Sequence, residues 1–331
     1  MIRIAIDAMG GDFAPAEIVK GAVQASLDLP VELILVGKAD KINKELSRYK
    51  KKGSLSVVHA EEVITNNEAP VSAVKQKKNS SLNLAVALVK NKEAVALVSA
   101  GNTGALMAAS LFGLGRIPGI ERPAIAGFFP TKKRPVLLLD IGANSDCKPK
   151  QLKQFAEMGA QFVEHVLHIK NPRVGLLNIG EEKEKGNALT TEAWPLLKEA
   201  PINFVGNVEP KEVFSGELNV VVSDGFVGNL ALKFGESVSG FLFDLIKKEL
   251  TKNPITYFAA FLLLPAFAGI KKKTDYDEYG GAPMLGINGV VIKAHGRAKA
   301  KAIKNAIRAA YEAHNQDIVG RISKLEKENE S

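Results

Sequence analysis

The feature that most constrains the fold is a repeated alternation between short β-branched runs and longer helical patterns. Each run ends in a turn rich in glycine, and a helical pattern follows. The runs are RIAIDAMGGD, VELILVG, AVALVSAGNTGA, RPVLLLDIGAN, RVGLLNIGEE and LNVVVSDGFVGN. Such alternation is typical of an α/β fold with a largely parallel sheet, in which ligands gather beyond the carboxyl ends of the strands. We therefore expect the chemistry of this chain in these loops.

The length and composition indicate a globular chain without a linker. The chain has 331 residues, enough for about two domains, with 46% hydrophobic and 24% charged residues. No internal repeat and no spacer rich in proline, glycine or serine divides it. We therefore expect residues 1–331 to form one intertwined α/β unit.

The charge balance narrows the class of partner. The formal net charge is +8 and the isoelectric point is near 9.3, which favours an anionic partner or surface. Nucleic acid is not expected, because the five tyrosines and one tryptophan are not interleaved with basic runs. Anionic lipid, phosphate and an acidic carrier protein remain as candidate partners.

The cysteine count and the start of the chain favour the cytoplasm. Cys147 is the single cysteine, which excludes a disulfide framework within the chain and suits a reducing compartment. The opening MIRIAIDAMGG reads as a strand and lacks the long apolar core of a signal peptide.

The loop VSAGNTGA is the first candidate anion site. It follows a strand and opens a helix, so its glycines allow close approach and its backbone amides favour an anion. Side chains of serine, asparagine and threonine add donors. An ordinary strand–helix turn would show the same pattern. The candidate substrate-binding residues here are Ser99, Gly101, Asn102, Thr103 and Gly104.

Further loops combine glycine, asparagine and aspartate, and one supplies a lysine. They suit the holding of phosphate and an oxyanion more than covalent catalysis. The alternative is that these carboxylates cap helices and fix loops. The candidate substrate-binding residues are Asp140, Asn144, Asn187, Asp224 and Gly225.

Neither a metal site nor a covalent nucleophile has good support. The five histidines are scattered and have no zinc-ligand spacing with the one cysteine, so we expect no metal and no cofactor. Cys147 has no histidine nearby in sequence to activate it, and a small buried residue is the better interpretation.

An apolar stretch of unusual length occupies residues 255–273. About 16 residues carry no formal charge and the last three are lysines, Lys271 to Lys273. The stretch is shorter than the ~20 residues that span a bilayer, and Pro265 is expected to interrupt it. With the preceding helical pattern and a break at Asn253-Pro254, residues 233–273 predict a projecting helical hairpin. It is either buried core or a segment lying in a membrane surface.

A basic face is predicted on the C-terminal helical pattern. Arg297, Lys301, Lys304 and Arg308 follow at intervals of four, three and four residues, which puts them on one side of a helix. The face could attract an acidic carrier protein, or be an ordinary solvated face.

Taken in order, the motifs resemble those of one family. IAIDAMGGDFAP, SAGNTGA, LLLDIGAN, LLNIGEE leading to KGN, VVSDGFVGN and YGGAPMLGINGVVIKAHG are similar to the bacterial phosphate acyltransferase family, PlsX. The resemblance runs from residue 4 to about residue 311, and the combined motifs are specific although each alone is weak. It implies a Rossmann-like α/β/α sandwich of the isopropylmalate dehydrogenase and phosphotransacetylase type, with the projecting hairpin.

The resemblance also implies a reaction and its partners. The family transfers a fatty acyl group from acyl carrier protein to inorganic phosphate, and the acyl phosphate supplies phosphatidic acid and phospholipid synthesis. A homodimer is implied, which acts at the inner face of the membrane beside a membrane glycerol-3-phosphate acyltransferase. Lys185 and Asn229 are carried over as active-site residues on loops, and His295 as a donor to the departing thiolate. Tyr257, Phe258, Phe261 and Leu262 are the expected membrane contacts.

Two other functions stay open from the residues alone. A dehydrogenase of the isopropylmalate type would share the architecture, but clustered metal-binding aspartates and a nucleotide-binding loop are not evident. A non-catalytic lipid-binding scaffold would use the hairpin without needing the anion-holding loops.

Overall fold

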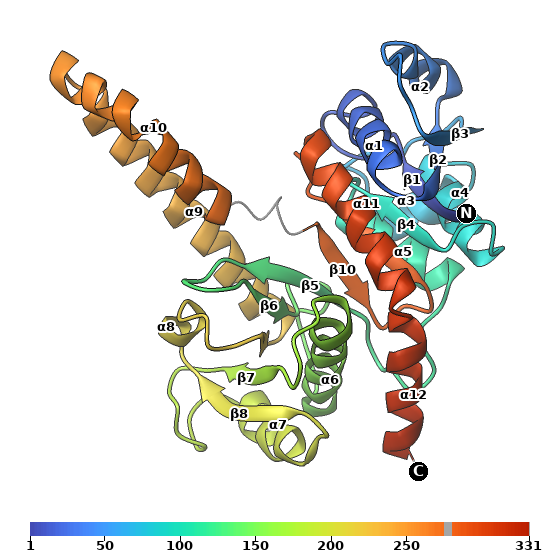
Figure 1. Ribbon diagram of the computed structural model, residues 1–331. Helices are drawn as coiled ribbons and strands as arrows, with labels where there is room; N and C mark the ends of the chain where they lie inside the picture. The colour runs from blue at the N-terminus through green and yellow to red at the C-terminus, as the bar shows by residue number, and fades with distance from the viewer. Residues whose placement is uncertain (275–279, 331) are drawn as a thin grey trace.

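A continuous eleven-stranded sheet runs through the computed structural model (Figure 1). The structure describes residues 1–274 and 280–330, without the side chains of residues 268, 271–274 and 330. The strand order is β3-β2-β1-β4-β11-β10-β5-β6-β9-β7-β8. The strands are β1 (Ile2–Asp7), β2 (Val31–Gly37), β3 (Ser54–His59), β4 (Ala96–Ser99), β5 (Ala124–Phe129), β6 (Val136–Leu139), β7 (Arg173–Leu177), β8 (Asn203–Val208), β9 (Val220–Val222), β10 (Ala282–Leu285) and β11 (Val290–Lys293).

Two groups of parallel strands run in opposite directions. Pairing is parallel from β3 to β11 and again from β6 to β8. The three steps between β11 and β6 are all antiparallel, and an odd number of such steps reverses the direction. The polar loops do follow carboxyl ends of strands, as predicted, but they form two groups that leave the sheet in opposite directions.

Helices cover both faces of this sheet. A large apolar cluster packs under α1, α6, α7, α11 and α12, and a second lies under α3, α4 and α5. The strands are accordingly buried on both sides, as in β2, where six of seven residues are buried. The helices are α1 (Ala16–Asp28), α2 (Ala39–Leu46), α3 (Pro70–Gln76), α4 (Ser81–Lys90), α5 (Thr103–Gly113), α6 (Pro149–Val166), α7 (Ala188–Glu199), α8 (Pro210–Val213), α9 (Gly225–Leu250), α10 (Pro254–Thr274), α11 (Ala300–Asn315) and α12 (Ile318–Glu330).

The face of the sheet that α3, α4 and α5 cover extends without a break to α9. Ile125 and Phe129 lie on the same side of β5, because side chains alternate along a strand. Ile125 belongs to the cluster under α5, and Phe129 to a third cluster that includes Leu232 of α9 at its margin. Ile141 packs against both clusters. The strip of sheet between α5 and α9 is therefore a single surface shared by the two strand groups.

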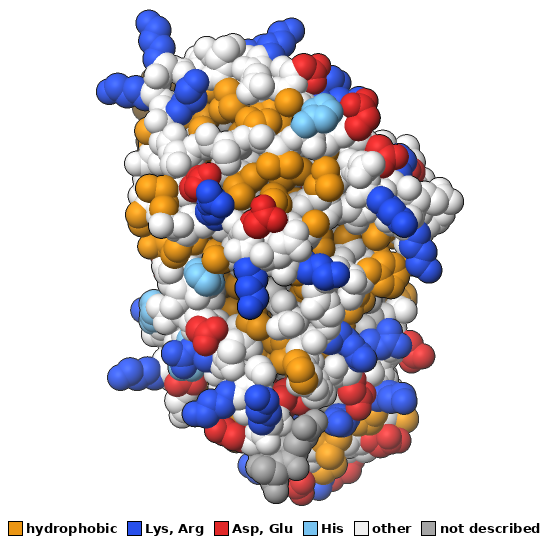
Figure 2. All heavy atoms as spheres, turned by 90° about the vertical axis from the view of Figure 1, so that its right-hand side faces the viewer, with side chains coloured by type: hydrophobic (Ala, Val, Ile, Leu, Met, Phe, Trp, Pro, Cys, Tyr) orange, Lys and Arg blue, Asp and Glu red, His pale blue; other side chains and the backbone are white. Residues whose placement is uncertain are grey.

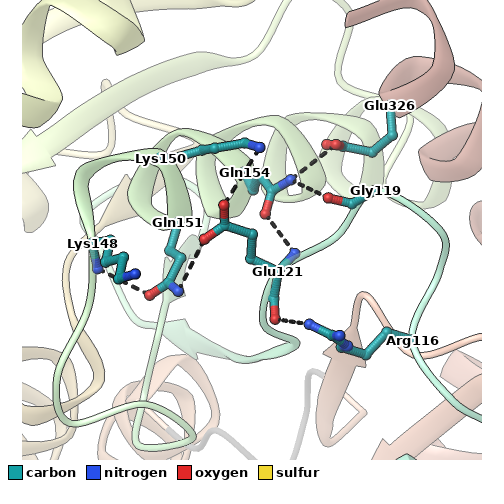
Figure 3. Close-up of polar contacts among 8 residues, drawn as sticks. All are labelled: Arg116, Gly119, Glu121, Lys148, Lys150, Gln151, Gln154 and Glu326. Atoms are coloured by element: carbon teal, nitrogen blue, oxygen red, sulfur yellow. Dashed lines mark hydrogen bonds and ion pairs between the residues drawn. The ribbon is translucent and has the colours of Figure 1, made fainter. Parts of the chain in front are cut away.

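A polar network holds the segment before β5 against α6 and α12 (Figure 3). Gln154 of α6 is buried, accepts from the Glu121 amide at 2.9 Å, and donates to the Gly119 carbonyl and the Glu326 carboxylate, both at 2.9 Å. Gln151 donates to the Glu121 carboxylate at 3.2 Å. These bonds fix the C-terminal helix to the side of the molecule opposite the α5–α9 strip.

The hairpin projects from the body as predicted (Figure 1). Its break is set by Asn253, whose side chain accepts from the amides of Ile255 at 3.1 Å and Thr256 at 3.0 Å and so begins α10. The expectation that Pro265 interrupts the segment is wrong, because Pro265 lies inside α10. The helix is exposed there, so the carbonyl freed by the missing amide remains accessible to solvent.

The basic face on α11 is smaller than predicted. The helix begins at Ala300, whose amide donates to the Glu17 carboxylate at 2.7 Å, and Arg297 lies in the turn before it. Its predicted place on the helical face is therefore wrong, because the chain turns at His295, whose carbonyl accepts from the Ala298 amide at 2.9 Å. Lys304 forms an ion pair with Asp28 of α1.

Candidate functional site

Three polar side chains form a row where β1, β4 and β11 end. Asp7, Ser99 and Lys293 are partners in register at the last position of each strand. The residue two positions earlier on each strand is apolar and belongs to the cluster under α4 and α5. Because side chains alternate, the row points to that same face.

Asp7 is a buried carboxylate that organises this row. It accepts from the hydroxyls of Ser81 and Ser99, both at 2.7 Å, and from the Met9 amide at 3.3 Å. Burial raises the pKa of Asp7, and the hydrogen bonds oppose that shift. Ser99 in turn accepts from the Gly101 amide at 3.0 Å. Ser99 thus links Asp7 to the loop before α5.

The start of α5 presents unoccupied backbone donors. Asn102 is the N-cap, and its side-chain oxygen accepts from the Ala105 amide at 3.0 Å, while its amide group donates to the Asn66 carbonyl at 3.1 Å. Within the described chain, no protein acceptor takes the amide hydrogens of Thr103 and Gly104, and both residues are exposed. This arrangement suits an anion.

In the second strand group, Asp140 fixes the loop that follows β6. It is fully buried and accepts from the backbone amides of Ile125 and Ala143 at 3.1 Å, Gly142 at 3.2 Å and Asn144 at 2.7 Å. The Asn144 side chain adds a bond at 3.0 Å. Desolvation raises the pKa of Asp140. These bonds favour the interpretation that this carboxylate holds a loop, and its contact with substrate stays a prediction.

The start of α9 approaches this loop so closely that glycine is required. The Gly225 amide donates to the Asn144 carbonyl at 2.7 Å, and a Cβ on Gly225 would lie 2.7 Å from an Asp140 carboxylate oxygen. A Cβ on Gly228 would lie 1.9 Å from the Asp140 carbonyl oxygen. Asp224 caps α9 by accepting from the amide three residues later at 2.9 Å. The DGFVGN motif is therefore explained first by backbone packing.

Asn229 lies in α9, so its expected position on a loop is wrong. The helix begins earlier than the sequence indicated because Asp224 caps it at the strand end. Asn229 is partly buried, and its side-chain nitrogen lies 3.4 Å from where a Cβ on Gly142 would stand. Its amide group is thus held against the loop that Asp140 fixes.

Lys185 lies on an exposed loop between β7 and α7. Two buried asparagines hold the backbone of this loop: Asn178 donates to the Lys185 carbonyl at 2.9 Å, and Asn207 donates to the Glu182 carbonyl at 2.7 Å. Asn187 caps α7, accepting from the amide three residues later at 3.0 Å. The backbone at Lys185 is therefore anchored while its side chain is exposed to solvent.

His295 and Lys293 are two basic side chains that lie close to each other, and Glu236 of α9 faces His295. Desolvation lowers the pKa of Lys293 to about 8, although Asp7 and Asp12 oppose the shift. Desolvation also lowers the pKa of His295, and so does the charge of Lys293, while Glu236 of α9 raises that pKa. Lys293 was not predicted; the available signal was a charged residue ending the apolar run GVVI.

The predicted residues thus fall into three places. Ser99, Gly101–Gly104 and His295 lie at the ends of β4 and β11, whereas Asp140, Asn144, Asp224, Gly225 and Asn229 surround the ends of β6 and β9. Lys185 and Asn187 follow β7. Within the described chain, no hydrogen bond or ion pair joins Lys185 to Asn229, so a common anion-holding centre stays a prediction.

Comparison with known proteins decides the family. The model of a family described as "Fatty acid synthesis protein" matches residues 2–321. The phosphate acyltransferase of Heliobacterium modesticaldum is 52% identical over 323 residues, covering 97% of this chain and 96% of the relative. That of Pelotomaculum thermopropionicum is 53% identical over 312 residues, covering 94% and 91%. The chain belongs to the phosphate acyltransferase family.

Solved structures support the same fold for this family member. A phosphotransacetylase from Streptococcus pyogenes matches with a TM-score of 0.63 at 17% identity, covering 95% of this chain and 94% of that one. A 4-hydroxythreonine-4-phosphate dehydrogenase from Klebsiella pneumoniae matches with a TM-score of 0.54 at 14% identity, covering 96% and 99%. At these identities the likeness shows the α/β fold alone.

Cys147 does not have the character of a nucleophile in this family member. Burial raises the pKa of its thiol to about 11, and the nearby carboxylates of Asp140, Asp224 and Asp146 add to the shift. The thiol is therefore protonated at neutral pH. Among the described residues, no three His, Cys, Asp or Glu side chains are grouped to hold a metal ion.

Proposed function

We propose that this phosphate acyltransferase transfers a fatty acyl group from acyl carrier protein to inorganic phosphate. The acyl phosphate feeds phosphatidic acid and phospholipid synthesis. The observation that carries the proposal is the start of α5, where exposed amides of Thr103 and Gly104 have no acceptor among the described residues. Full-length similarity to phosphate acyltransferases supports it.

The reaction needs two anions to be held and no covalent intermediate. A phosphate oxygen bonds to the thioester carbonyl carbon, the carbon–sulfur bond breaks, and sulfur leaves with the electron pair. Hydrogen phosphate loses its proton and the thiolate gains one, so protons balance. Orientation and preorganised charge supply the acceleration. Gly101 and Gly104 allow the phosphate to approach the backbone, and Asn102 orients the turn.

Three side chains have proposed roles in this step. Lys185 neutralises phosphate or the oxyanion, and Asn229 donates a hydrogen bond to one of them. The lowered pKa leaves His295 mostly neutral at pH 7, so its ring starts in the form that can accept a proton. His295 therefore takes the proton that phosphate loses and passes it to the thiolate afterwards, rather than acting first as the donor.

The carrier protein docks on the cations of α11. Acyl carrier proteins are acidic, so a basic surface raises the rate of encounter. Lys301 and Arg308 are exposed, while Lys304 is half-buried and shares its charge with Asp28. On the side of the molecule drawn in Figure 2, lysine and arginine are spread among acidic side chains instead of forming one patch. Docking therefore depends on a local cluster, not on net charge alone.

The hairpin holds the enzyme at an anionic membrane surface. Tyr257, Phe258, Phe261 and Leu262 are each more than 60% exposed, and no element of the described chain covers them. No helix in the described part has both the length and the apolar character to cross a bilayer. We place the protein in the cytoplasm as a homodimer, peripherally attached beside a membrane glycerol-3-phosphate acyltransferase.

Lysines near the end of α10 would strengthen attachment to anionic lipid. Lys271, Lys272 and Lys273 could contribute about 1 kcal/mol each. Their side chains lie outside the described residues.

A direct assay tests the proposed reaction. Purified protein is incubated with palmitoyl-acyl carrier protein and inorganic phosphate, and palmitoyl phosphate is followed by mass spectrometry. Sulfate in place of phosphate is the control, because it offers charge without yielding acyl phosphate. Product that requires phosphate supports the proposal.

A lipid-binding scaffold is the second candidate, because the exposed hairpin alone would serve it. Co-sedimentation with anionic liposomes without any turnover would favour the scaffold. The dehydrogenase alternative is checked in the same preparation by following NADH with 3-isopropylmalate and NAD.

A further inference from the structure

Lys293 is a buried cation without a direct counter-ion among the described residues. It is 7% exposed, and no carboxylate of the described chain lies within 4.0 Å of its ammonium. Its hydrogen bond is to the carbonyl of Ala294. An ammonium carries three donors, so two of them have no acceptor among the described residues. Burying a charge in this state is costly unless an anion completes it.

Among the described residues, the carboxylate that acts most strongly on the Lys293 charge already has other hydrogen-bond partners. Asp7 is two strands away in the same row, and its oxygens accept from Ser81, Ser99 and Met9. Ser99 stands between Asp7 and Lys293. Asp7 therefore acts on Lys293 at a distance, and the two open donors remain available to a ligand.

Lys293 lies beside the turn to which we assign phosphate binding in the proposed reaction. Its register partner Ser99 leads directly into the α5 turn where Thr103 and Gly104 present open amides. The next strand pairs Ala282 with Lys293, and Ala282 continues the surface toward Ile125 and the α9 side. Lys293 thus belongs to the strip of sheet between α5 and α9.

We propose that Lys293 is the cation of a phosphate-binding site on the strip of sheet between α5 and α9. The inference rests on the proposed function and names a further group for it. The ligand is a phosphate group, which comes either from inorganic phosphate or from the phosphodiester of the carrier's pantetheine arm. The ammonium neutralises the anion while the α5 amides orient it.

The charged groups around Lys293 set the pH range of binding. Asp7 of β1 and Asp12 of the following loop favour its charge, His295 lies close to it, and Glu236 faces His295 from α9. With a pKa of about 8, Lys293 is charged below that pH and loses its charge above it. Stabilisation by phosphate should therefore decline as pH rises through about 8.

The test compares Lys293→Met with wild type and with Lys299→Met, an exposed lysine outside the site. Thermal unfolding is measured with and without inorganic phosphate, because a ligand that binds the native state raises the melting temperature. Without phosphate, we expect Lys293→Met to melt at or above the wild-type temperature, because it removes a buried charge that has no ion-pair partner in the described part of the chain. Phosphate should then stabilise wild type and Lys299→Met more than Lys293→Met.

Kinetics identify the source of the phosphate group. If inorganic phosphate is the ligand, Lys293→Met raises its KM roughly 10²-fold, as expected when one partner of a buried charge pair is removed, and leaves the KM for acyl carrier protein unchanged. If the pantetheine phosphodiester is the ligand, the KM for acyl carrier protein rises instead, and the defect disappears with acyl-pantetheine, which has no phosphate. Either pattern supports the site.

Two results would overturn the inference. Unchanged kinetics with unchanged phosphate stabilisation would remove Lys293 from ligand binding. Loss of the fold in both Lys293→Met and Lys293→Gln would show that the lysine has a structural partner. If wild type makes no acyl phosphate, the proposed function fails, and the thermal measurement with phosphate still decides whether the site exists.

Discussion

The loop that Asp140 fixes and the α9–α10 hairpin differ in whether the chain itself covers their side chains. In the loop after β6, the buried carboxylate of Asp140 finds its partners within the chain, in the amides of Ile125, Gly142, Ala143 and Asn144. In the hairpin, large apolar side chains have no cover in the described chain. The Asp140 loop is complete within one copy of the chain, whereas the large apolar side chains of the hairpin stay exposed.

The largest expected effect comes from removing the buried carboxylate of Asp140. Asp140→Ala leaves several buried amides without an acceptor, at a cost of about 1–3 kcal/mol each. We expect the melting temperature to fall by on the order of 10 °C or the protein to unfold. Calorimetry measures this, with Asp146→Ala, an exposed residue of the same loop, as the control. A small change at Asp140 equal to that at Asp146 would mean that the loop does not depend on the carboxylate.

The next effect concerns the proposed chemistry of two residues, one on the loop after β7 and one at the start of α9. Lys185→Ala and Asn229→Ala should each lower turnover by about 10²-fold, the range for losing an oxyanion donor. Melting temperatures should stay close to wild type, because Lys185 is exposed and Asn229 is partly exposed. Lys183→Ala on the same loop is the matched control. Near-normal turnover in both variants would remove them from the active site.

A smaller effect is expected on the hairpin, and on attachment alone. Phe258→Glu combined with Phe261→Glu should release the protein from anionic liposomes, because each inserted side chain contributes about 1.5–3 kcal/mol. Melting temperature and turnover on soluble carrier thioester should be unchanged, since both residues are exposed. Co-sedimentation and calorimetry read the two properties.

A fall in melting temperature, or conversion of a dimer to a monomer, would contradict this expectation. It would mean that the apolar face is covered by a second copy of the chain and not by lipid. Measuring liposome co-sedimentation and melting temperature in one preparation therefore distinguishes lipid from a second copy of the chain as the surface that covers the hairpin.

The smallest effect is expected on α11. Lys301→Glu with Lys304→Glu should raise the KM for carrier thioester several-fold and leave the phosphate KM alone, because surface charges act mainly on encounter. Lys304→Glu also opposes Asp28, so Lys304→Met, which removes the ion pair without reversing charge, is the control. Equal effects at 50 and 300 mM salt would argue against an electrostatic role.

The sequence predicted the helices and strands better than the way in which the strands pair in the sheet. Alternation of β-branched runs with helical patterns is local, and so is the break that Asn253 and Pro254 impose before α10. The joining of the two strand groups into one sheet depends on β10, which lies near the C-terminal end of the chain yet inserts between β11 and β5 in the middle of the sheet. Such pairing joins distant residues and has no local signature.

The predicted site shows the same limit. Asn102, Asn187 and Asp224 were chosen as polar loop residues, and the structure uses all three to cap helices. A capping residue and a ligand-binding residue share the same chemistry, so sequence alone does not separate them. Lys293 was missed because a lysine after an apolar run is ordinary until its burial is known.

The continuity of α9 fixes a length. The helix has 26 residues, so at ~1.5 Å per residue it extends roughly 39 Å from Gly225, one turn before Asn229, to the hairpin loop. A single rod of this kind has no joint at which its two ends could move independently. The height of Asn229 above any surface that the hairpin meets is therefore determined by the number of residues in α9. Seven added residues, about two turns, would raise it by about 10 Å while keeping nearly the same faces aligned.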